Sequence, residues 1–409
     1  MTFDYGADLQ SEDLYIKHPK IGDFTALLDA DILPYVVGHS TDPELYIDTI
    51  AKACKMIGLD EYNPKEFPEE GFDALMKLDG FKAPVNHLNW LINNWVKLAE
   101  ADSALFFLSG ENNFRNDVAF TSKYKGNRTK PKPPYFYELR RYISRFHDPI
   151  ISRWNEADDM MSIYQSKSNE EVMAQITGNG PKAWGPEHAM FSTTCIVTKD
   201  KDLRMVPGWF CDVMTGEKQW ITPIGDLEPV YKDKEVTAYE QWPIVDGKAV
   251  DPTIVQKLNL VVDTYSRGKN SGELKTKRVA VGTTISNQLK KLSGSGLKFF
   301  YAQIVMGDVA DNYPGIPGKG AKVAYDVLDG LDNEKDMYYA VLDLYKEKYG
   351  STHIATNWRH NKLLELTPVQ MMLEQGRLAW MQRFDGDVWR GTKHCPLGTG
   401  DEWNEETQE

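Results

Sequence analysis

The chain has 409 residues, 41% of them hydrophobic and 11% aromatic, which predicts one or two globular domains and excludes wholesale disorder. A net charge of −13 argues on average against a nucleic-acid partner, although the average hides where basic residues gather. We find no apolar run of membrane-spanning length, no secretion signal and four scattered cysteines without a CxxC pair, so we expect a cytoplasmic protein with reduced thiols and no membrane partner.

The first half of the chain contains two apolar runs that predict buried strands. After a polar extension over residues 1–23, the run 24–28 ends at Asp29. A strand-end aspartate is a common start for a metal site, but capping of the next helix is the commoner explanation for any one such residue. Residues 42–100 have helical periodicity and carry no evident chemistry. The run 104–108 predicts a second strand and is followed by Glu111.

A basic segment interrupts this acidic chain between residues 123 and 153, where nine Lys/Arg face two Asp/Glu. For its loop, Tyr124 to Arg128, interleaved aromatic and basic residues favour phosphate neutralisation with base stacking. For the predicted helix over 135–146 we favour an amphipathic structural helix whose Leu139 and Phe146 pack and whose arginines face water.

Acidic residues recur where apolar segments end. They fall in three groups: Glu156, Asp158 and Asp159; Asp200 and Asp202; Asp308 and Asp311. The first group opens a predicted helix, where a cap needs only one acid. The second follows a strand over 195–198, and the third follows residues 304–306, which we predict as another strand end. Carboxylates at the carboxyl ends of parallel strands converge, so the sequence predicts an acid-lined crevice for two divalent cations.

A glycine-rich turn follows the last acids and precedes a helix predicted to begin at Ala321. Its glycines are Gly315, Gly318 and Gly320. Closely spaced glycines before a helix let backbone N–H groups approach a phosphate. A phosphate site would therefore adjoin the metal site.

Five ordered motifs carry a resemblance to the 5′-nuclease family. LLDAD, KYKGNR, EADD, VTKDKDL and GDVADNYPGIPGKGAK resemble motifs of flap endonucleases, of the 5′-exonuclease domain of bacterial DNA polymerase I and, most closely, of phage 5′-to-3′ exonucleases. The likeness covers residues 24–204 and 297–385. It implies an α/β fold with a central, mostly parallel sheet flanked by helices, and a helix-hairpin-helix part that binds DNA.

The resemblance also implies roles for individual residues. The metal-binding acids would be Asp29, Glu156, Asp158, Asp159, Asp200, Asp202, Asp308 and Asp311. Lys125 and Arg128 would reach the scissile phosphate, and Tyr124 would stack near the reacting end. The family's aspartate after the second strand falls on Gly110, where the adjacent Glu111 is the candidate replacement. The helix-hairpin-helix, often with K⁺, would use Gly315, Gly318, Lys319, Gly320 and Lys322.

The implied function is a Mg²⁺-dependent 5′-to-3′ exonuclease with 5′-flap endonuclease and RNase H-like activity, using two ions that Mn²⁺ can replace. Its substrates would be double-stranded DNA with 5′ ends or flaps and RNA–DNA hybrids, in phage replication or recombination in the host cytoplasm. One alternative is a non-catalytic, structure-specific DNA-binding protein, with Gly110 as the sign of loss. Another is a magnesium phosphohydrolase acting on nucleotides, which leaves the basic segment and the glycine turn unexplained.

The expected domains are a nuclease core over 24–204 and 297–312, an insertion over 205–296, a helical part over 313–385 and an acidic tail over 386–409. Within the insertion, residues 209–220 predict a hairpin, residues around 254–265 a helix, and residues 267–291 a basic stretch. The insertion is either a surface loop or a contact with DNA or replication proteins.

Overall fold

The computed structural model describes residues 23–177, 185–392 and 395–396, and the chain divides into two compact units. One unit comprises residues 1–228 and 293–409, and the other is Pro229–Leu292, which we call the ribbon unit. The expected N-terminal extension up to residue 22 and the acidic end from residue 397 lie outside the described residues. Among those residues, no helix combines the length and hydrophobicity needed to cross a bilayer.

A six-stranded sheet of order β3-β2-β1-β4-β5-β6 forms the centre of the larger unit. Its strands are β1 (Thr25–Asp29), β2 (Ser103–Leu108), β3 (Ile150–Ile151), β4 (Thr194–Thr198), β5 (Gly208–Asp212) and β6 (Lys218–Ile221). All neighbours pair in parallel except β5 with β6. The predicted α/β class with a mostly parallel central sheet is confirmed, and β1, β2 and β4 end at the same edge.

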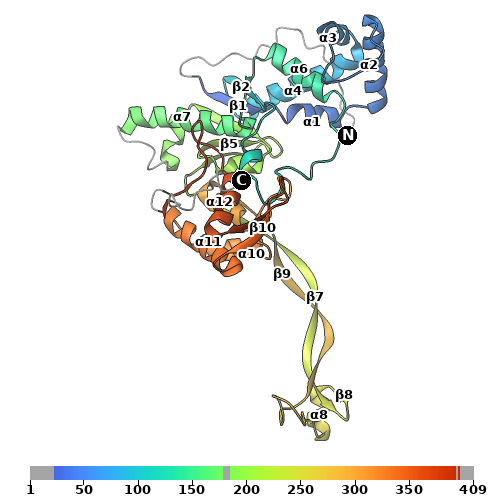
Figure 1. Cartoon of the computed structure of the whole chain (residues 1–409), viewed down its shortest axis with the longest axis vertical. Coiled ribbons are helices and arrows are strands. Elements are labelled where there is room, and N and C mark those ends of the chain that lie inside the picture. The colour runs from blue at the N-terminus through green and yellow to red at the C-terminus, as the bar shows by residue number, and fades with distance from the viewer. Residues whose placement is uncertain (1–22, 178–184, 393–394, 397–409) are drawn as a thin grey trace. The chain divides into compact units, whose positions relative to one another are not determined.

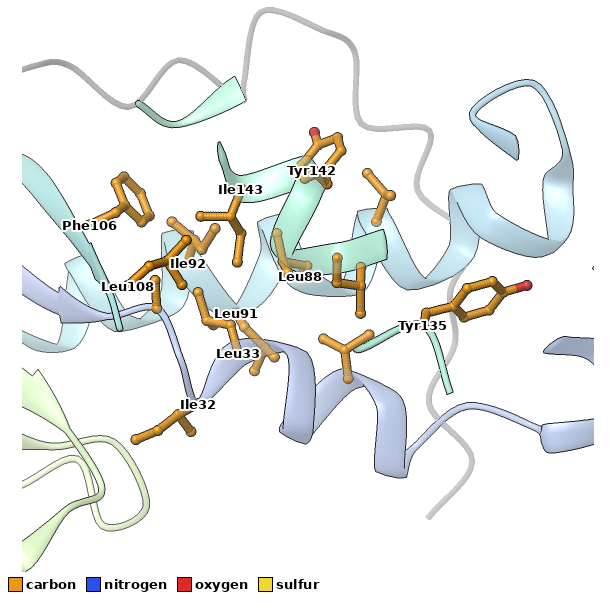
Figure 2. Close-up of a cluster of buried hydrophobic side chains, with 14 of the residues drawn as sticks. Ile32, Leu33, Leu88, Leu91, Ile92, Phe106, Leu108, Tyr135, Tyr142 and Ile143 are labelled. Carbon is orange, nitrogen blue, oxygen red and sulfur yellow. The ribbon is translucent and has the colours of Figure 1, made fainter. Parts of the chain in front are cut away.

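Alternate residues of each strand face opposite sides of the sheet, so each side has its own core. Ala26 and Leu28 pack into one hydrophobic cluster and Leu27 into another. The first side is covered by α1 (Leu33–His39), α2 (Pro43–Ile57), α3 (Glu69–Leu75), α4 (Asp79–Leu98) and α6 (Phe136–Phe146). Figure 2 shows buried side chains of α1, α4 and α6 packed against those of β2. The second side is covered by α7 (Ala157–Thr177) through residues such as Met161 (Figure 1).

Helix α6 has the predicted amphipathic packing, and its arginines reach solvent as expected, but they also form ion pairs. Leu139 is buried, whereas Phe146 is half exposed, contrary to expectation. Arg140 pairs with Asp31, and Arg145 pairs with Asp73 at 2.6 Å. The basic face of α6 is therefore largely neutralised by neighbouring acids.

Residues 304–306 are not the end of a strand, contrary to the sequence-based prediction. They form the last turn of α9 (Gly296–Met306), in which eight of eleven residues are buried. A helix buried on all sides has no polar face, so its apolar run cannot be distinguished from a buried strand by periodicity. Asp308 and Asp311 therefore follow a helix that ends at Met306 and is capped by Gly307, with φ +72°.

The remaining elements of the larger unit pack around α9. The helices are α5 (Arg115–Val118), α10 (Ala321–Leu328), α11 (Glu334–Tyr349) and α12 (Pro368–Ala379), with 3₁₀ turns η2 (Pro186–Phe191) and η3 (Lys201–Met205). Short hairpins join β10 (His353–Thr356) to β11 (Leu363–Leu366) and β12 (Gly391–Thr392) to β13 (Cys395–Pro396). Trp389 is buried against Phe300, so packed structure continues into the expected tail.

The ribbon unit is built from two long strands, β7 (Leu227–Val245) and β9 (Thr276–Gly294). A short β8 (Lys248–Ala249) pairs with β7, and α8 (Pro252–Leu258) follows it (Figure 1). The helix is shorter than the predicted 254–265 because Asn259 adopts a left-handed conformation with φ +50°. The unit is also narrower than the expected 205–296 insertion, since β5 and β6 belong to the central sheet.

Candidate metal and phosphate site

The site begins where β1 and β4 end side by side. Asp29 is the last residue of β1, and Asp200 lies two residues beyond β4. The Thr198 hydroxyl donates to the Asp29 carboxylate at 3.0 Å and accepts from the Asp200 backbone N–H at 3.0 Å. Because β1 has β2 on one side and β4 on the other, this edge is a topological switch point, where α/β proteins commonly bind ligands.

Helix α7 brings a third carboxylate, Asp158, to Asp29 and Asp200. We call these three residues the acid cluster. Burial, followed by the charges of Asp31 and Asp200, raises the pKa of Asp29 to about 8. Burial and the charges of Asp29, Asp200 and then Glu156 raise the pKa of Asp158. Burial also raises the pKa of Asp200. Within the described residues, no member of the cluster forms an ion pair.

A second acidic group lies beyond Asp200 and is arranged around Lys201. The Lys201 ammonium is 2.6 Å from Asp308 and 3.9 Å from Asp202. Burial and the charge of Asp200 raise the pKa of Asp202 to about 8. Burial opposes ionisation of Asp308, but the bond to Lys201 outweighs it and lowers the pKa of Asp308.

Two residues of this second group were missed by the sequence analysis. Lys201 stands between the two predicted acids, a position from which its partner cannot be deduced. Gln303 donates to Asp202 at 2.5 Å and accepts from the Tyr313 hydroxyl at 3.0 Å. Gln303 lies on α9, which we predicted to end as a strand, and only helical spacing would have brought its side chain to this edge.

The basic loop, residues 122–128, is fastened to the acid loop, residues 308–313. The Lys125 N–H donates to the Asp311 carbonyl at 2.9 Å, and the Asn127 side chain donates to the Val309 carbonyl at 2.5 Å. The Arg128 guanidinium is 2.8 Å from the Asp311 carboxylate. Lys125 holds φ +52°, a conformation that costs a non-glycine residue about 1 kcal/mol, and these contacts offset that cost.

Lys125 and Tyr124 connect the basic loop to the acids. Lys125 pairs with Glu156 and lies 4.0 Å from Asp311. Burial alone would raise the pKa of Glu156, but Lys125 and Arg115 outweigh it and lower the pKa to about 2. The Tyr124 hydroxyl is 2.8 Å from both Glu156 and Asp311. Its side chain is only 4% exposed, so the ring offers no face for the base stacking we expected.

Asp159 is turned away from the acid cluster, in contrast to its predicted role. Both of its carboxylate oxygens accept from the Arg115 guanidinium, at 2.5 and 2.9 Å, and both side chains are fully buried. Arg115 also donates to the carbonyls of Leu378 and Trp380. The pair therefore fastens α7 to the end of α12, and its carboxylate has no free oxygen to offer a cation. No local pattern identifies Arg115 as this partner.

The edge beyond β2 lacks a carboxylate in the predicted position. Glu111 is exposed, and among the described residues its side chain forms no hydrogen bond or ion pair. At Gly110, a Cβ atom would lie 2.1 Å from the Ser152 carbonyl oxygen, and the Gly110 N–H donates to the Ser152 hydroxyl at 3.0 Å. An aspartate at this position is therefore excluded by backbone packing against the residue after β3.

The glycines of the turn between α9 and α10 differ in the space around them: Gly315 is closely packed, whereas Gly318 and Gly320 are open. Gly315 has φ +60°, and a Cβ there would lie 2.3 Å from the Gly307 nitrogen, so it is required by packing. Gly318 and Gly320 have no neighbouring atom within 4 Å of such a Cβ. In the described residues, no side chain caps α10. Lys319 pairs with Glu347 at 2.9 Å and Lys322 with Asp326 at 2.9 Å.

The donor set consists of carboxylates, with no histidine or cysteine, which suits hard cations such as Mg²⁺ or Mn²⁺. Within residues 23–177, 185–392 and 395–396, no three carboxylate, imidazole or thiol groups gather closely enough to enclose an ion. Lys125, Arg128 and Lys201 each bind one of the neighbouring carboxylates. The acid cluster, which has no such cation, is the part that best fits a metal.

Comparison with known proteins gives structural likeness only. No protein-family model matches the chain, and no curated protein matches its sequence. One similar solved structure is a bacteriophage T5 protein co-crystallised with metal ions, at 12% identity and a TM-score of 0.38, with 87% of this chain and 88% of that one covered. Another is T5 5′-exonuclease with bound zinc ions, at 12% identity and a TM-score of 0.36, with 87% of this chain and 88% of that one covered. A third is T5 flap endonuclease in a pseudo-enzyme–product complex with DNA and metal ions, at 11% identity and a TM-score of 0.33, with 87% of this chain and 98% of that one covered. Superposition at these values assigns no activity to this chain.

Proposed function

We propose that this chain is a divalent-metal-dependent nuclease that hydrolyses phosphodiester bonds of DNA, releasing products from 5′ ends and 5′ flaps. The observation that carries the proposal is the acid cluster of Asp29, Asp158 and Asp200. The three buried carboxylates lie near the switch point of the sheet without closing around an ion, and none has an ion-pair partner among the described residues. Burial raises the pKa of all three, and the charges of neighbouring acids add to it. Such a site stores repulsion that a cation relieves.

In this proposal the chain binds two divalent cations, Mg²⁺ with Mn²⁺ as a substitute, and the carboxylates draw closer together when the ions bind. The acid cluster would hold one, and Asp202 and Asp308 would contribute to the other, with Asp200 lying between the two groups. Bound ions of this kind supply Lewis-acid activation of water and charge stabilisation at a phosphate. Glu156 and Asp311 complete the acidic surface, whereas Asp159 is committed to Arg115.

Lys125 and Arg128 are the phosphate-binding groups in this proposal. Both are held beside the acids by the fastening of the basic loop to the acid loop. In the absence of substrate Lys125 pairs with Glu156 and Arg128 with Asp311. When a phosphate binds, each cation exchanges its carboxylate partner for the phosphate. The Tyr124 hydroxyl is hydrogen-bonded to Glu156 and Asp311 and so holds both carboxylates beside these cations. Loss of one such charge costs about 10²–10³-fold in rate.

Duplex DNA would be gripped at the start of α10. Gly318 and Gly320 leave backbone there open to a close approach, and the helix start is uncapped within the described residues. Backbone N–H groups at a helix start favour phosphate and read no base sequence. We therefore propose recognition of DNA structure and polarity, with K⁺ at this turn and RNA–DNA hybrids as further substrates.

A second candidate, a non-catalytic protein that binds DNA structures, is favoured by one observation. The position after β2 that would supply another carboxylate is closed by the contact of Gly110 with Ser152. A protein that binds but never cuts would retain the basic loop and the α10 turn while lacking a complete acid set.

The test is cleavage of 5′-labelled duplex and 5′-flap DNA, with Mg²⁺ or with EDTA. The wild type releases short 5′ products only with Mg²⁺, Asp158→Asn abolishes release while retaining DNA binding, and Glu111→Gln, the matched acid at the same edge, cuts normally. Lys125→Met slows cleavage by about 10²–10³-fold. Binding without cleavage under Mg²⁺ or Mn²⁺ would replace the nuclease proposal with the binding-protein one, and hydrolysis of free nucleotides alone would refute both.

A further inference from the structure

The ribbon unit has a charge opposite to that of the whole chain. Between Pro229 and Leu292 there are eleven Lys/Arg and seven Asp/Glu, a net charge of +4, whereas the whole chain has −13. Strand β9 contributes Lys277, Arg278, Lys290 and Lys291 and contains no acidic residue. In a chain with an excess of acids, this sign reversal points to an anionic partner.

The cations of the ribbon unit lack acidic partners. In the described part of the chain, none of the eleven forms an ion pair, although acids such as Asp233 and Glu235 lie on the same ribbon. Arg278 instead lies over the Tyr239 ring at 3.9 Å. The larger unit has both paired cations, such as Lys125 and Lys319, and exposed lysines without an ion pair, such as Lys55, whereas in the ribbon unit all eleven are of the second kind. The ribbon therefore presents unneutralised positive charge.

The two strands present that charge along an extended, core-free surface. The Asp226 carbonyl accepts from Ser295 at 2.8 Å, and the Ile244 N–H donates to Lys275 at 2.9 Å, so β7 and β9 run antiparallel. No residue from 229 to 291 is buried. A two-stranded hairpin without a core is only marginally stable by itself, so a partner that covers it would stabilise it.

The basic residues gather at the two ends of the ribbon. Lys232, Lys234, Lys290 and Lys291 lie near the start of β7, and Lys275, Lys277 and Arg278 near its far end. Twelve residues separate Arg278 from Lys290, which corresponds to about 40 Å along a strand. One turn of B-DNA is about 34–36 Å long, so the two groups match phosphates about one turn apart.

We propose that the ribbon unit binds the phosphate backbone of double-stranded DNA, independently of base sequence. Its two-stranded width is one that the major groove accepts, and its exposed cations match the phosphates on either side. This contact is additional to the proposed nuclease site and does not require cleavage. Exposed apolar residues on the far end, Leu258, Val261 and Leu274, are the competing surface for a protein partner, but they leave the unpaired cations unexplained.

The experiment measures binding of the full-length protein to a fluorescent duplex of about 30 base pairs, about three turns long. Anisotropy is recorded in EDTA, so that no cleavage occurs, between about 50 and 200 mM KCl. The ribbon variant is Lys277→Gln/Arg278→Gln/Lys290→Gln/Lys291→Gln. The control carries the same charge change on exposed lysines of the larger unit, Lys52→Gln/Lys55→Gln/Lys65→Gln/Lys77→Gln. Thermal unfolding of both variants checks that the fold is intact.

The plot of log K, the DNA association constant, against log[KCl] has a negative slope. Its magnitude is smaller by about 3.6 in the ribbon variant, about 0.9 for each of the four lost phosphate contacts, and is unchanged in the control. A fall of less than about 1 in the ribbon variant, or an equal fall in the control, overturns the proposal and leaves the apolar end of the ribbon as a protein-binding surface. Ribbon-dependent binding by a wild type that never cleaves DNA would refute the nuclease function and leave this proposal standing.

Discussion

Asp158 and Asp159 are adjacent on α7, and the structure predicts opposite effects when each is replaced by asparagine. Asp159 is bound through both oxygens to Arg115, with both side chains fully buried. Asp159→Asn removes the carboxylate that binds both sides of the buried Arg115 guanidinium and leaves only Glu156, at 3.6 Å, to balance its charge, which costs up to about 3 kcal/mol of unfolding free energy. Asp158 has a raised pKa because burial and the neighbouring acids disfavour its charge. Asp158→Asn therefore raises the unfolding free energy of the metal-free protein.

The assay is urea unfolding of both variants and the wild type in EDTA at pH 8, with the denaturant slope compared to verify that the same transition is measured. Added Mg²⁺ should then stabilise wild type and Asp159→Asn and have little effect on Asp158→Asn. The reasoning is refuted if both substitutions shift stability in the same direction, or if Asp159→Asn changes it by less than about 1 kcal/mol while abolishing the response to Mg²⁺.

Three further outcomes follow from the site. Burial raises the pKa of Asp29 and Asp202 from 3.8 to about 8, so between these values the folded chain holds protons that the unfolded chain has released. The unfolding free energy of the metal-free protein therefore falls as pH rises from about 5 to 8, by up to about 1.4 kcal/mol per pH unit for each group. A thermal unfolding midpoint that stays constant or rises over this pH range would contradict this. Gly110→Ala places a Cβ 2.1 Å from the Ser152 carbonyl and should cost about 1–3 kcal/mol in urea unfolding, whereas wild-type stability would show that the backbone yields. Tyr124→Phe keeps the ring but removes the hydroxyl bonded to two carboxylates, so DNA cleavage slows about tenfold or more. An unchanged rate would show that this hydroxyl does not position the two acids.

The parts of the fold that could be predicted from sequence are those that depend on the pattern of apolar and polar residues within a short segment. Strands β1, β2 and β4 are short apolar runs that end in polar residues, and their parallel pairing confirms the predicted class of sheet. Once the sheet is known to be parallel, the meeting of Asp29 with Asp200 follows from their positions at strand ends.

The failures depend on contacts between residues distant in sequence. The apolar run before Asp308 is a helix because neighbours on all sides bury it, and no local signal records those neighbours. Asp159 is removed from the acid cluster by Arg115, 44 residues earlier. Gly110 is fixed by the Ser152 carbonyl, 42 residues later in the chain. Each of these contacts is set by tertiary packing, which spacing within a motif does not encode.

The most direct test of the central claim is to count the divalent ions bound at the acid cluster. Electron paramagnetic resonance of Mn²⁺ titrated into the wild type should show two bound ions per chain, with at least one lost in Asp29→Asn/Asp200→Asn and none lost in Glu111→Gln. Free Mn²⁺ at every ratio in the wild type, or equal binding in the double variant, would show that these carboxylates hold no metal and that the proposed chemistry is wrong.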